Sequence, residues 1–363
     1  MRTVRLLLPL VFALLGLALP AAAQVTPAAG YTPPDDTPTI KVGMTLFTDF
    51  TYQSAPKVTD ADGNTVSPSS FNVGRAYINV TGNISHLLGF RITPDIVRES
   101  GAGSSVNGSL TFRLKYAYAQ VNLDDWMPKG SWARLGMQQT PWVDFEENLY
   151  RYRFQGTVFL DREGFLSSSD VGASFHTNFA RNYGDVHAGF YNGETYARPE
   201  VSDQKAFMIR GTFRPLPASP YLRGLRLTGF WDHDAYVKDA ERKRALFAVT
   251  YEHKYVNAAW QITDQKDQAS ATKPLTDGSG WSMWVTPKTT KGFEGLLRFD
   301  HLEPNDTINS RRERAIAGVA YWLPHQGNVS SAVLLDYEQV TNKGFTPGLP
   351  RQERIAVHGL VNF

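Results

Sequence analysis

The last ten residues, Arg354-Ile355-Ala356-Val357-His358-Gly359-Leu360-Val361-Asn362-Phe363, decide the fold. Their odd positions are mainly apolar and end on the phenylalanine, whereas their even positions include the arginine, the histidine and the asparagine. Because side chains of a β-strand alternate between its faces, one face lies in an apolar medium and the other lies near water. About ten tilted residues also suffice for one bilayer crossing by a barrel strand. This stretch therefore predicts a membrane-spanning strand, although a closing edge strand of a soluble β-sandwich has the same pattern.

The other end of the chain carries the pattern of a secretory signal peptide. Residues 1–23 begin with Arg2 and Arg5, continue through a short apolar core and end at the small-residue site 21–23. We expect this segment to be cleaved, and no later stretch approaches the roughly 18 apolar residues of a helical span. A terminal Phe363 on an exported chain resembles the sorting signal of bacterial outer-membrane barrels. We therefore expect the outer membrane of a Gram-negative-type cell.

Composition excludes several classes of function. The 363 residues include no cysteine, so disulfides, thiolate catalysis and cysteine metal sites are excluded. Without Arg2 and Arg5, the 37 basic residues fall to 35, which equals the number of acidic residues, so no global charge suggests nucleic acid. The mean hydropathy of −0.32 suits a soluble protein, but a barrel that is polar inside and apolar outside has the same average.

Alternating polarity recurs from residue 40 to the end. Residues 24–39 are rich in Pro, Ala, Thr and Asp and predict a disordered periplasmic lead, and we interpret 40–363 as one barrel domain. In the segment 110–123, apolar side chains from Leu110 to Tyr118 alternate with Arg113 and Lys115. A charge that faces lipid at mid-depth costs roughly 2–4 kcal/mol, so both bases should point inward. Strands are expected near 40–53, 71–83, 88–98, 110–123, 131–140, 169–180, 185–192, 204–215, 223–234, 242–254, 256–264, 280–288, 292–303, 312–323, 329–340 and 352–363.

These sixteen segments predict an all-β, transmembrane 16-stranded antiparallel β-barrel. Connections are mostly short on one side and longer on the other, which is typical of outer-membrane barrels, and an even strand number returns both termini to the same side. Pro94 interrupts the third strand and predicts a bulge. Aromatic residues at strand ends predict interfacial girdles: Phe50, Tyr52, Trp126, Trp132, Trp231, Trp281, Trp284, Tyr321, Trp322 and Phe363.

The charged face of the strands should line the lumen, where we count fourteen basic and eight acidic side chains. An arginine-rich wall favours anions because it focuses the field in a narrow aqueous path. Alternatively, the wall arginines are held in ion pairs with the wall acids, which stiffens the barrel and selects little. Both interpretations stay open. The candidate pore-lining bases are Arg75, Arg91, Arg113, Lys115, Arg134, Arg210, Arg298 and Arg314.

A lumen of sixteen strands is too wide for wall side chains to fill, so a further segment must narrow it. Residues 141–168 form the third long connection and mix charged with aromatic residues. We expect an inward-folded third loop in which Tyr150, Tyr152 and Phe154 pack while Arg151 and Arg153 face solute. Alternatively, the loop caps the outer mouth or covers a subunit contact. The candidate constriction residues are Asp144, Glu146, Glu147, Arg151, Arg153 and Arg162.

Several short motifs resemble the phosphate-selective porin O and P family. They are the run 134–142 (RLGMQQTPW), the block 150–153 (YRYR), the segment 170–173 (DVGA), the segment 115–118 (KYAY) and the terminal Phe363. The resemblance implies a 16-stranded trimeric porin in which the third loop forms the constriction. It does not imply phosphate as the solute. A phosphate site of the family's type needs a basic ladder at the constriction, whereas this loop also carries acids: Asp144, Glu146, Glu147, Asp161 and Glu163.

Catalytic and cofactor motifs are not found. The eight histidines are scattered without metal-ligand spacing, and neither a G-x-S-x-G elbow nor a phosphate-binding G-x-x-x-x-G-K-[ST] loop occurs. We therefore expect no enzyme, no catalytic or metal site and no cofactor.

The favoured hypothesis is an outer-membrane porin, a passive diffusion channel for small hydrophilic solutes with a preference for anions, phosphate and related oxyanions among them. Its partners would be outer-membrane lipids, small inorganic or organic anions and two further copies in a homotrimer, and no nucleic acid is expected. Two alternatives stay open, namely a closed structural or adhesion barrel and a secreted soluble β-sandwich that binds carbohydrate.

Overall fold

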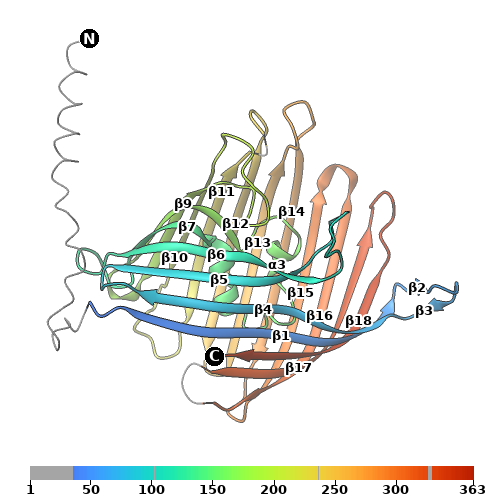
Figure 1. The fold of residues 1–363 in the computed structure, drawn as a ribbon, viewed down its shortest axis with the longest axis horizontal. Coiled ribbons are helices and arrows are strands. Elements are labelled where there is room, and N and C mark those ends of the chain that lie inside the picture. The colour runs from blue at the N-terminus through green and yellow to red at the C-terminus, as the bar shows by residue number, and fades with distance from the viewer. Residues whose placement is uncertain (1–35, 102, 236, 326–328) are drawn as a thin grey trace.

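The computed structural model describes residues 36–101, 103–235, 237–325 and 329–363. The predicted signal peptide and residues 24–35 of the predicted lead lie outside the described residues. Antiparallel strands form one closed barrel of sixteen (Figure 1). The first eight are β1 (Thr39–Ala55), β4 (Ser69–Asn83), β5 (Leu88–Arg98), β6 (Leu110–Asn122), β7 (Trp132–Gln139), β8 (Ser169–Asn178), β9 (Gly184–Tyr191) and β10 (Ala206–Phe213). The others are β11 (Leu225–Asp234), β12 (Arg242–His253), β13 (Val256–Asp267), β14 (Thr276–Pro287), β15 (Phe293–Asn305), β16 (Ser310–Leu323), β17 (Ser330–Lys343) and β18 (Gln352–Asn362).

The last strand closes the barrel, as its sequence pattern predicts. β1 pairs with β18 on one side and with β4 on the other. Met44 and Phe363 exchange two backbone hydrogen bonds of 3.0 Å at the end of the β1–β18 seam. We call the edge that holds the start of β1 and the end of β18 the terminal edge, and the opposite edge the loop edge. Among the described residues, no helix has the length and apolarity needed to cross a membrane.

Alternate side chains of each strand face outward and form an apolar surface. Leu135 of β7 and Val319 of β16 are 69% and 62% exposed, and the neighbouring inward residues, such as Arg314 of β16, are buried or half-buried. A bilayer core offers no partner to an open strand edge or to a charge, so a closed barrel with this outer face is the form in which β-strands cross it. The chain therefore spans an outer membrane of the Gram-negative type.

One β-bulge changes which residues face the lumen. Thr93 of β5 pairs with Tyr116, but Pro94 pairs with Leu114, so Lys115 is an extra residue in β6. The bulge predicted at Pro94 is confirmed. Because an extra residue reverses the alternation, Lys115 and Tyr116 both face inward. The expectation that the tyrosines of this strand share the lipid-facing side with Leu114 was therefore wrong.

The connections are mostly short at the terminal edge and mostly longer at the loop edge, as expected. Two exceptions are the eleven residues between β10 and β11 at the terminal edge and the four residues between β15 and β16 at the loop edge. The short helix η2 (Asp306–Ile308) lies between β15 and β16. A small hairpin of β2 (Val58–Thr59) and β3 (Thr65–Val66) lies in the first long loop, between β1 and β4. In addition, Trp132, Trp284 and Trp322 face the lumen rather than an interfacial girdle.

Candidate functional site: the passage beside the third loop

The third long connection begins with the helix α2 (Pro141–Leu149). Pro141 occupies the first helical turn, where its missing N–H removes no hydrogen bond. Trp142, Val143 and Leu149 are buried. The helix lies on the inner side of the wall, because inward side chains hold it: Arg210 of β10 donates to the Pro141 carbonyl at 3.1 Å and Asn257 of β13 donates to the Leu149 carbonyl at 3.2 Å.

Glu146 is on the buried face of α2. Its carboxylate accepts hydrogen bonds from Trp142 Nε1 at 3.1 Å and from Gln261 Nε2 of β13 at 2.6 Å. Burial raises the pKa of Glu146 to about 7, and the nearby Arg298 guanidinium acts in the opposite direction. Glu146 is thus a polar anchor between the helix and the wall.

The chain after α2 packs its aromatic rings on the wall. Tyr150 meets Trp284 of β14 with ring centroids 5.3 Å apart, and Tyr152 meets Trp322 of β16 at 5.9 Å. Phe154 lies 6.3 Å from Phe47 of β1. All three loop rings are buried, as the sequence predicts. Trp284 and Trp322 face the lumen and form the wall side of this packing.

Ion pairs fix the rest of the loop. The short helix α3 (Phe159–Arg162) ends at Arg162, which binds Glu338 of β17 at 3.0 Å. The next residue, Glu163, binds Arg312 at 2.6 Å and Arg314 at 2.7 Å, both on β16. The loop is therefore attached mainly to the strands from β10 to β17, with a further contact from Phe154 to β1.

The inward arginines of β10–β18 are all paired with carboxylates. Arg226 binds Glu252 at 2.7 Å, Arg244 binds Asp267 at 2.7 Å, and Arg298 binds Asp300 at 2.8 Å. The other pairs are Arg210–Asp185, Arg242–Asp234, Arg312–Glu163, Arg314 with Glu163 and Glu338, and Arg354–Glu338. For the arginines within these strands, ion pairing therefore explains the pattern, whereas Arg214, directly after β10, has no ion pair among the described residues.

The bases of β4–β7 are different. Arg75 and Arg113 share one carboxylate, Asp95, at 3.1 Å and 3.9 Å. Within the described ranges, Arg91, Lys115 and Arg134 make no ion pair. Each instead lies over an aromatic ring, as with Arg91 over Tyr116 at 4.4 Å. This half of the wall therefore keeps uncompensated positive charge.

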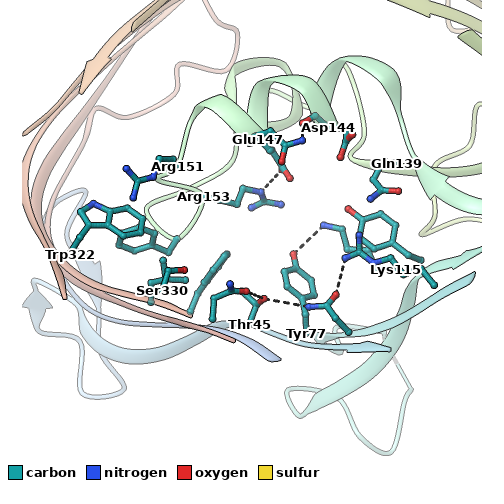
Figure 2. A pocket seen from close by; sticks show the side chains of 18 residues that line it. Thr45, Tyr77, Lys115, Gln139, Asp144, Glu147, Arg151, Arg153, Trp322 and Ser330 are labelled. Atoms are coloured by element: carbon teal, nitrogen blue, oxygen red, sulfur yellow. Dashed lines mark hydrogen bonds and ion pairs between the residues drawn. The ribbon is translucent and has the colours of Figure 1, made fainter. Parts of the chain in front are cut away.

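A cavity of about 500 Å³ lies between the two halves. Figure 2 shows Asp144 and Glu147 on α2, with Lys115 and Tyr77 projecting from the facing strands. Its ionisable lining comprises four bases and two acids, so its net charge is positive: Arg91, Lys115, Arg151, Arg153, Asp144 and Glu147. The two carboxylates come from the loop and two of the bases come from the opposite wall, so the charges face each other across the cavity.

The predicted constriction residues separate into two groups. Asp144, Glu147, Arg151 and Arg153 line the cavity. Arg151 also binds Glu294 at 2.9 Å, and Arg153 binds Glu147 in a short contact. Glu146 and Arg162 do not line this cavity and serve as anchors.

The predicted wall bases divide in the same way. Arg91 and Lys115 line the cavity, Arg134 and Arg210 line a second cavity nearer the terminal edge, and Arg298 and Arg314 are buried in ion pairs. Arg75 and Arg113 lie on the same wall with Asp95. The inward direction of Tyr116 and Tyr118 was missed, and the bulge at Pro94 is the signal that could have indicated it. The inward direction of Trp132 follows from the alternation that it shares with Arg134.

Comparison with solved structures identifies the class of fold. The chain is similar to the anion-selective porin from Comamonas acidovorans, with a TM-score of 0.63, 13% identity, and coverage of 90% of this chain and 100% of that one. It is also similar to the outer membrane channel DcaP of Acinetobacter baumannii, with a TM-score of 0.58, 11% identity, and coverage of 93% and 100%. Salmonella typhi OmpF in complex with daunomycin matches with a TM-score of 0.58, 9% identity, and coverage of 89% and 97%.

The chain thus has the fold of the outer-membrane porins. No protein-family model and no curated protein matches its sequence. The identities are low, so the structural likeness defines the fold and leaves the phosphate-selective family as a resemblance of short motifs.

Proposed function

We propose that this protein is a passive diffusion channel that prefers small anions over cations. Solute would move through the aqueous space beside the third loop, with Asp144, Glu147, Arg151 and Arg153 on the loop side of the constriction. Arg91 and Lys115 would attract anions from the opposite wall. The proposal contains no catalytic step and no cofactor.

The observation that carries the proposal is the unequal pairing of the inward bases. Every inward arginine within the strands β10–β18 makes an ion pair with a carboxylate, whereas Arg91, Lys115 and Arg134 make none in the part of the chain that the structure describes. An ion pair produces little field at a distance, but uncompensated bases beside a narrow aqueous path raise the local anion concentration. One structural neighbour is described as an anion-selective porin, which agrees with this proposal.

Reconstitution in planar bilayers tests the proposal. We expect stepwise conductance and, across a potassium chloride gradient, a reversal potential of the sign for chloride preference. Lys115→Met should move that potential several-fold closer to the unselective value because it removes a base from the constriction. Lys243→Met makes the same substitution at an outward-facing position of β12 and should leave the potential unchanged.

Two results would contradict the proposal. A folded barrel without conductance would favour a closed structural or adhesion barrel. A wild-type reversal potential on the cation side would refute anion preference while leaving a channel.

We also propose a homotrimer, since one structural neighbour, OmpT of Vibrio cholerae, is described in a trimer form. The outer faces of β1 and β4 offer an aromatic contact, with Phe50 and Phe71 centroids 4.7 Å apart and Phe71 86% exposed. Chemical cross-linking of Phe71→Asp against the unmodified protein tests this contact, and an unaltered trimer in the variant would exclude it.

A further inference from the structure

The bases of the β4–β7 wall are arranged in a regular way that the anion-channel proposal does not require. Four of the five, all except Arg75, have an aromatic ring against them. The guanidinium carbon of Arg113 lies 4.6 Å from the centroid of Tyr196, and Lys115 Nζ lies 5.0 Å from that of Tyr77. With Arg91 over Tyr116, these pairs reach from the loop edge to the constriction, and we call them the cation–ring series.

The series ends toward the terminal edge in a closer arrangement. The guanidinium carbon of Arg134 lies 3.7 Å from the centroid of Trp132 and 4.6 Å from that of Tyr118. His176 stacks on Trp132 with centroids 5.2 Å apart. Trp132, Arg134 and His176 line a cavity of about 450 Å³. All of these side chains are half-buried, so part of each ring meets the lumen.

The hydrogen bonds of these bases argue against a strongly hydrated inorganic ion. Arg91 already donates from Nε to Thr93 at 2.9 Å and from Nη2 to Asn79 at 2.8 Å. Arg134 donates from Nε to Gln120 at 2.8 Å and from Nη1 to Gln139 at 3.2 Å. A filter for phosphate must replace its hydration shell with several converging donors, and here much of that donor capacity is used.

The same arrangement suits an anion that carries a flat ring. A guanidinium is planar and weakly hydrated, and it stacks on aromatic faces while its edge binds a carboxylate. Aromatic rings add offset or edge-to-face contacts with a further ring. We infer that planar aromatic carboxylates are the favoured solutes, and that Arg134 with Trp132 and Tyr118 is a binding position for them on the way out of the constriction. This inference rests on the proposed anion channel and names its class of solute.

The test compares two acids of equal charge in the reconstituted full-length mature protein. Benzoate is planar and aromatic, whereas cyclohexanecarboxylate is saturated and puckered. We expect benzoate to reduce chloride current at a half-blocking concentration about fivefold lower than cyclohexanecarboxylate or phosphate requires. Trp132→Leu should reduce this difference to near unity while the chloride reversal potential keeps its sign.

Two controls keep the test decisive. Trp260→Leu makes the same substitution on the outward face of β13 and should leave the benzoate preference intact. Tyr118→Leu removes the second ring over Arg134 and replaces Trp132→Leu if that variant does not show the heat-modifiable migration of a folded barrel.

The outcomes separate the inference from the function on which it rests. Intact chloride conductance with equal block by the three anions, or with phosphate the strongest, would overturn the inference alone. Loss of the benzoate preference in Trp260→Leu would also overturn it, since the effect would not come from the lumen. Absence of chloride conductance in the unmodified protein would overturn the proposed function as well.

Discussion

At the residue scale, Glu338 of β17 joins three parts of the chain. Its buried carboxylate accepts hydrogen bonds from Arg162 of the loop at 3.0 Å, Arg314 of β16 at 2.6 Å and Arg354 of β18 at 2.7 Å. Gln155 adds a fourth at 2.8 Å. Removal of a carboxylate from such a network leaves buried cations without compensation, which is far costlier than loss of an exposed pair.

Glu338→Gln should therefore lower the free energy of unfolding by about 3–5 kcal/mol. Denaturant titration in lipid vesicles measures this quantity. Glu353→Gln on the adjacent strand is the matched control, because its partner Arg351 is exposed and the loss should stay below about 1 kcal/mol. Equal losses in the two variants would show that Glu338 does not hold the loop.

The residues of the site also show what sequence could predict at this scale. Arg91, Lys115 and Arg134 were expected in the lumen because a charge cannot face lipid. The inward direction of Tyr116 was not expected, since it depends on an extra residue in β6. Pro94 indicates that a bulge is present, but the pairing of β5 with β6 sets its position. Likewise, the roles of Glu146 and Arg162 as anchors depend on wall residues more than 100 positions away in sequence.

At the element scale, α2 is held to the wall by a carboxyl group whose protonation matters. Glu146 has a folded-state pKa of about 7, raised by burial above its ordinary value of 4.5. Between pH 4.5 and about pH 7, Glu146 is therefore mostly protonated in the folded protein and mostly ionised in the unfolded chain. The protonated Glu146 carboxyl contributes its full stabilisation below the unfolded pKa of 4.5, and this stabilisation is lost as the pH rises through the folded pKa of about 7.

Glu146→Gln should remove this pH dependence. The thermal unfolding midpoint of the unmodified protein is expected to decline between about pH 5 and pH 8 relative to that of the variant, because only the former must ionise a buried acid. Thermal scans at matched ionic strength give the difference between the two midpoints. Parallel profiles over this range would contradict a protonated Glu146 under the helix.

Strands and loop differ in how far their sequences determine them. The alternation of polarity placed the strands within a few residues, as with β18, because it reflects a difference between lipid and water that acts on each strand separately. The 141–168 segment has no such repeat. Its helix α2 and its docking arise from contacts with β10–β17, so sequence indicated its aromatic packing but not which charges would remain beside the cavity.

At the scale of the whole molecule, the outward face defines the position of the barrel in the membrane. Leu335 of β17 lies in the apolar band and is 54% exposed, whereas Thr341 of the same strand faces outward nearer the loop edge. Ion pairs on the outer face, such as Arg311–Glu313 at 3.3 Å, occur toward that edge. The band should therefore lie in hydrocarbon and the pairs among head groups.

Leu335→Arg is expected to destabilise the barrel by about 2–4 kcal/mol, whereas Thr341→Arg should cost about 0–1 kcal/mol. The difference arises because burial of a guanidinium in hydrocarbon is costly only near the bilayer centre. Denaturant unfolding of both variants in vesicles measures it. Equal costs would mean that the membrane lies elsewhere on the barrel.

The division of the lumen into two halves is also a property of the whole molecule. The loop is held mainly by the strands from β10 to β17, where the paired arginines lie. The cavity lies on the other side of the loop, against β1–β7 and the ends of β16–β18, as Trp322 and Ser330 show in Figure 2. From the sequence alone, both interpretations of the arginine-rich wall stayed open, because a linear pattern does not show which arginines form ion pairs with other strands or with the loop. In the structure, ion pairing accounts for the arginines within β10–β18, whereas unpaired Arg91, Lys115 and Arg134 among the described residues support the proposed anion preference.

The most direct test of this division is the reversal potential in a potassium chloride gradient for Arg91→Gln and Arg354→Gln, measured beside the unmodified protein. Both variants lose one inward positive charge, but only Arg91 lines the passage. The account predicts a marked loss of chloride preference in Arg91→Gln and a potential close to that of the unmodified protein in Arg354→Gln. Equal shifts in the two variants, or a larger shift in Arg354→Gln, would contradict it.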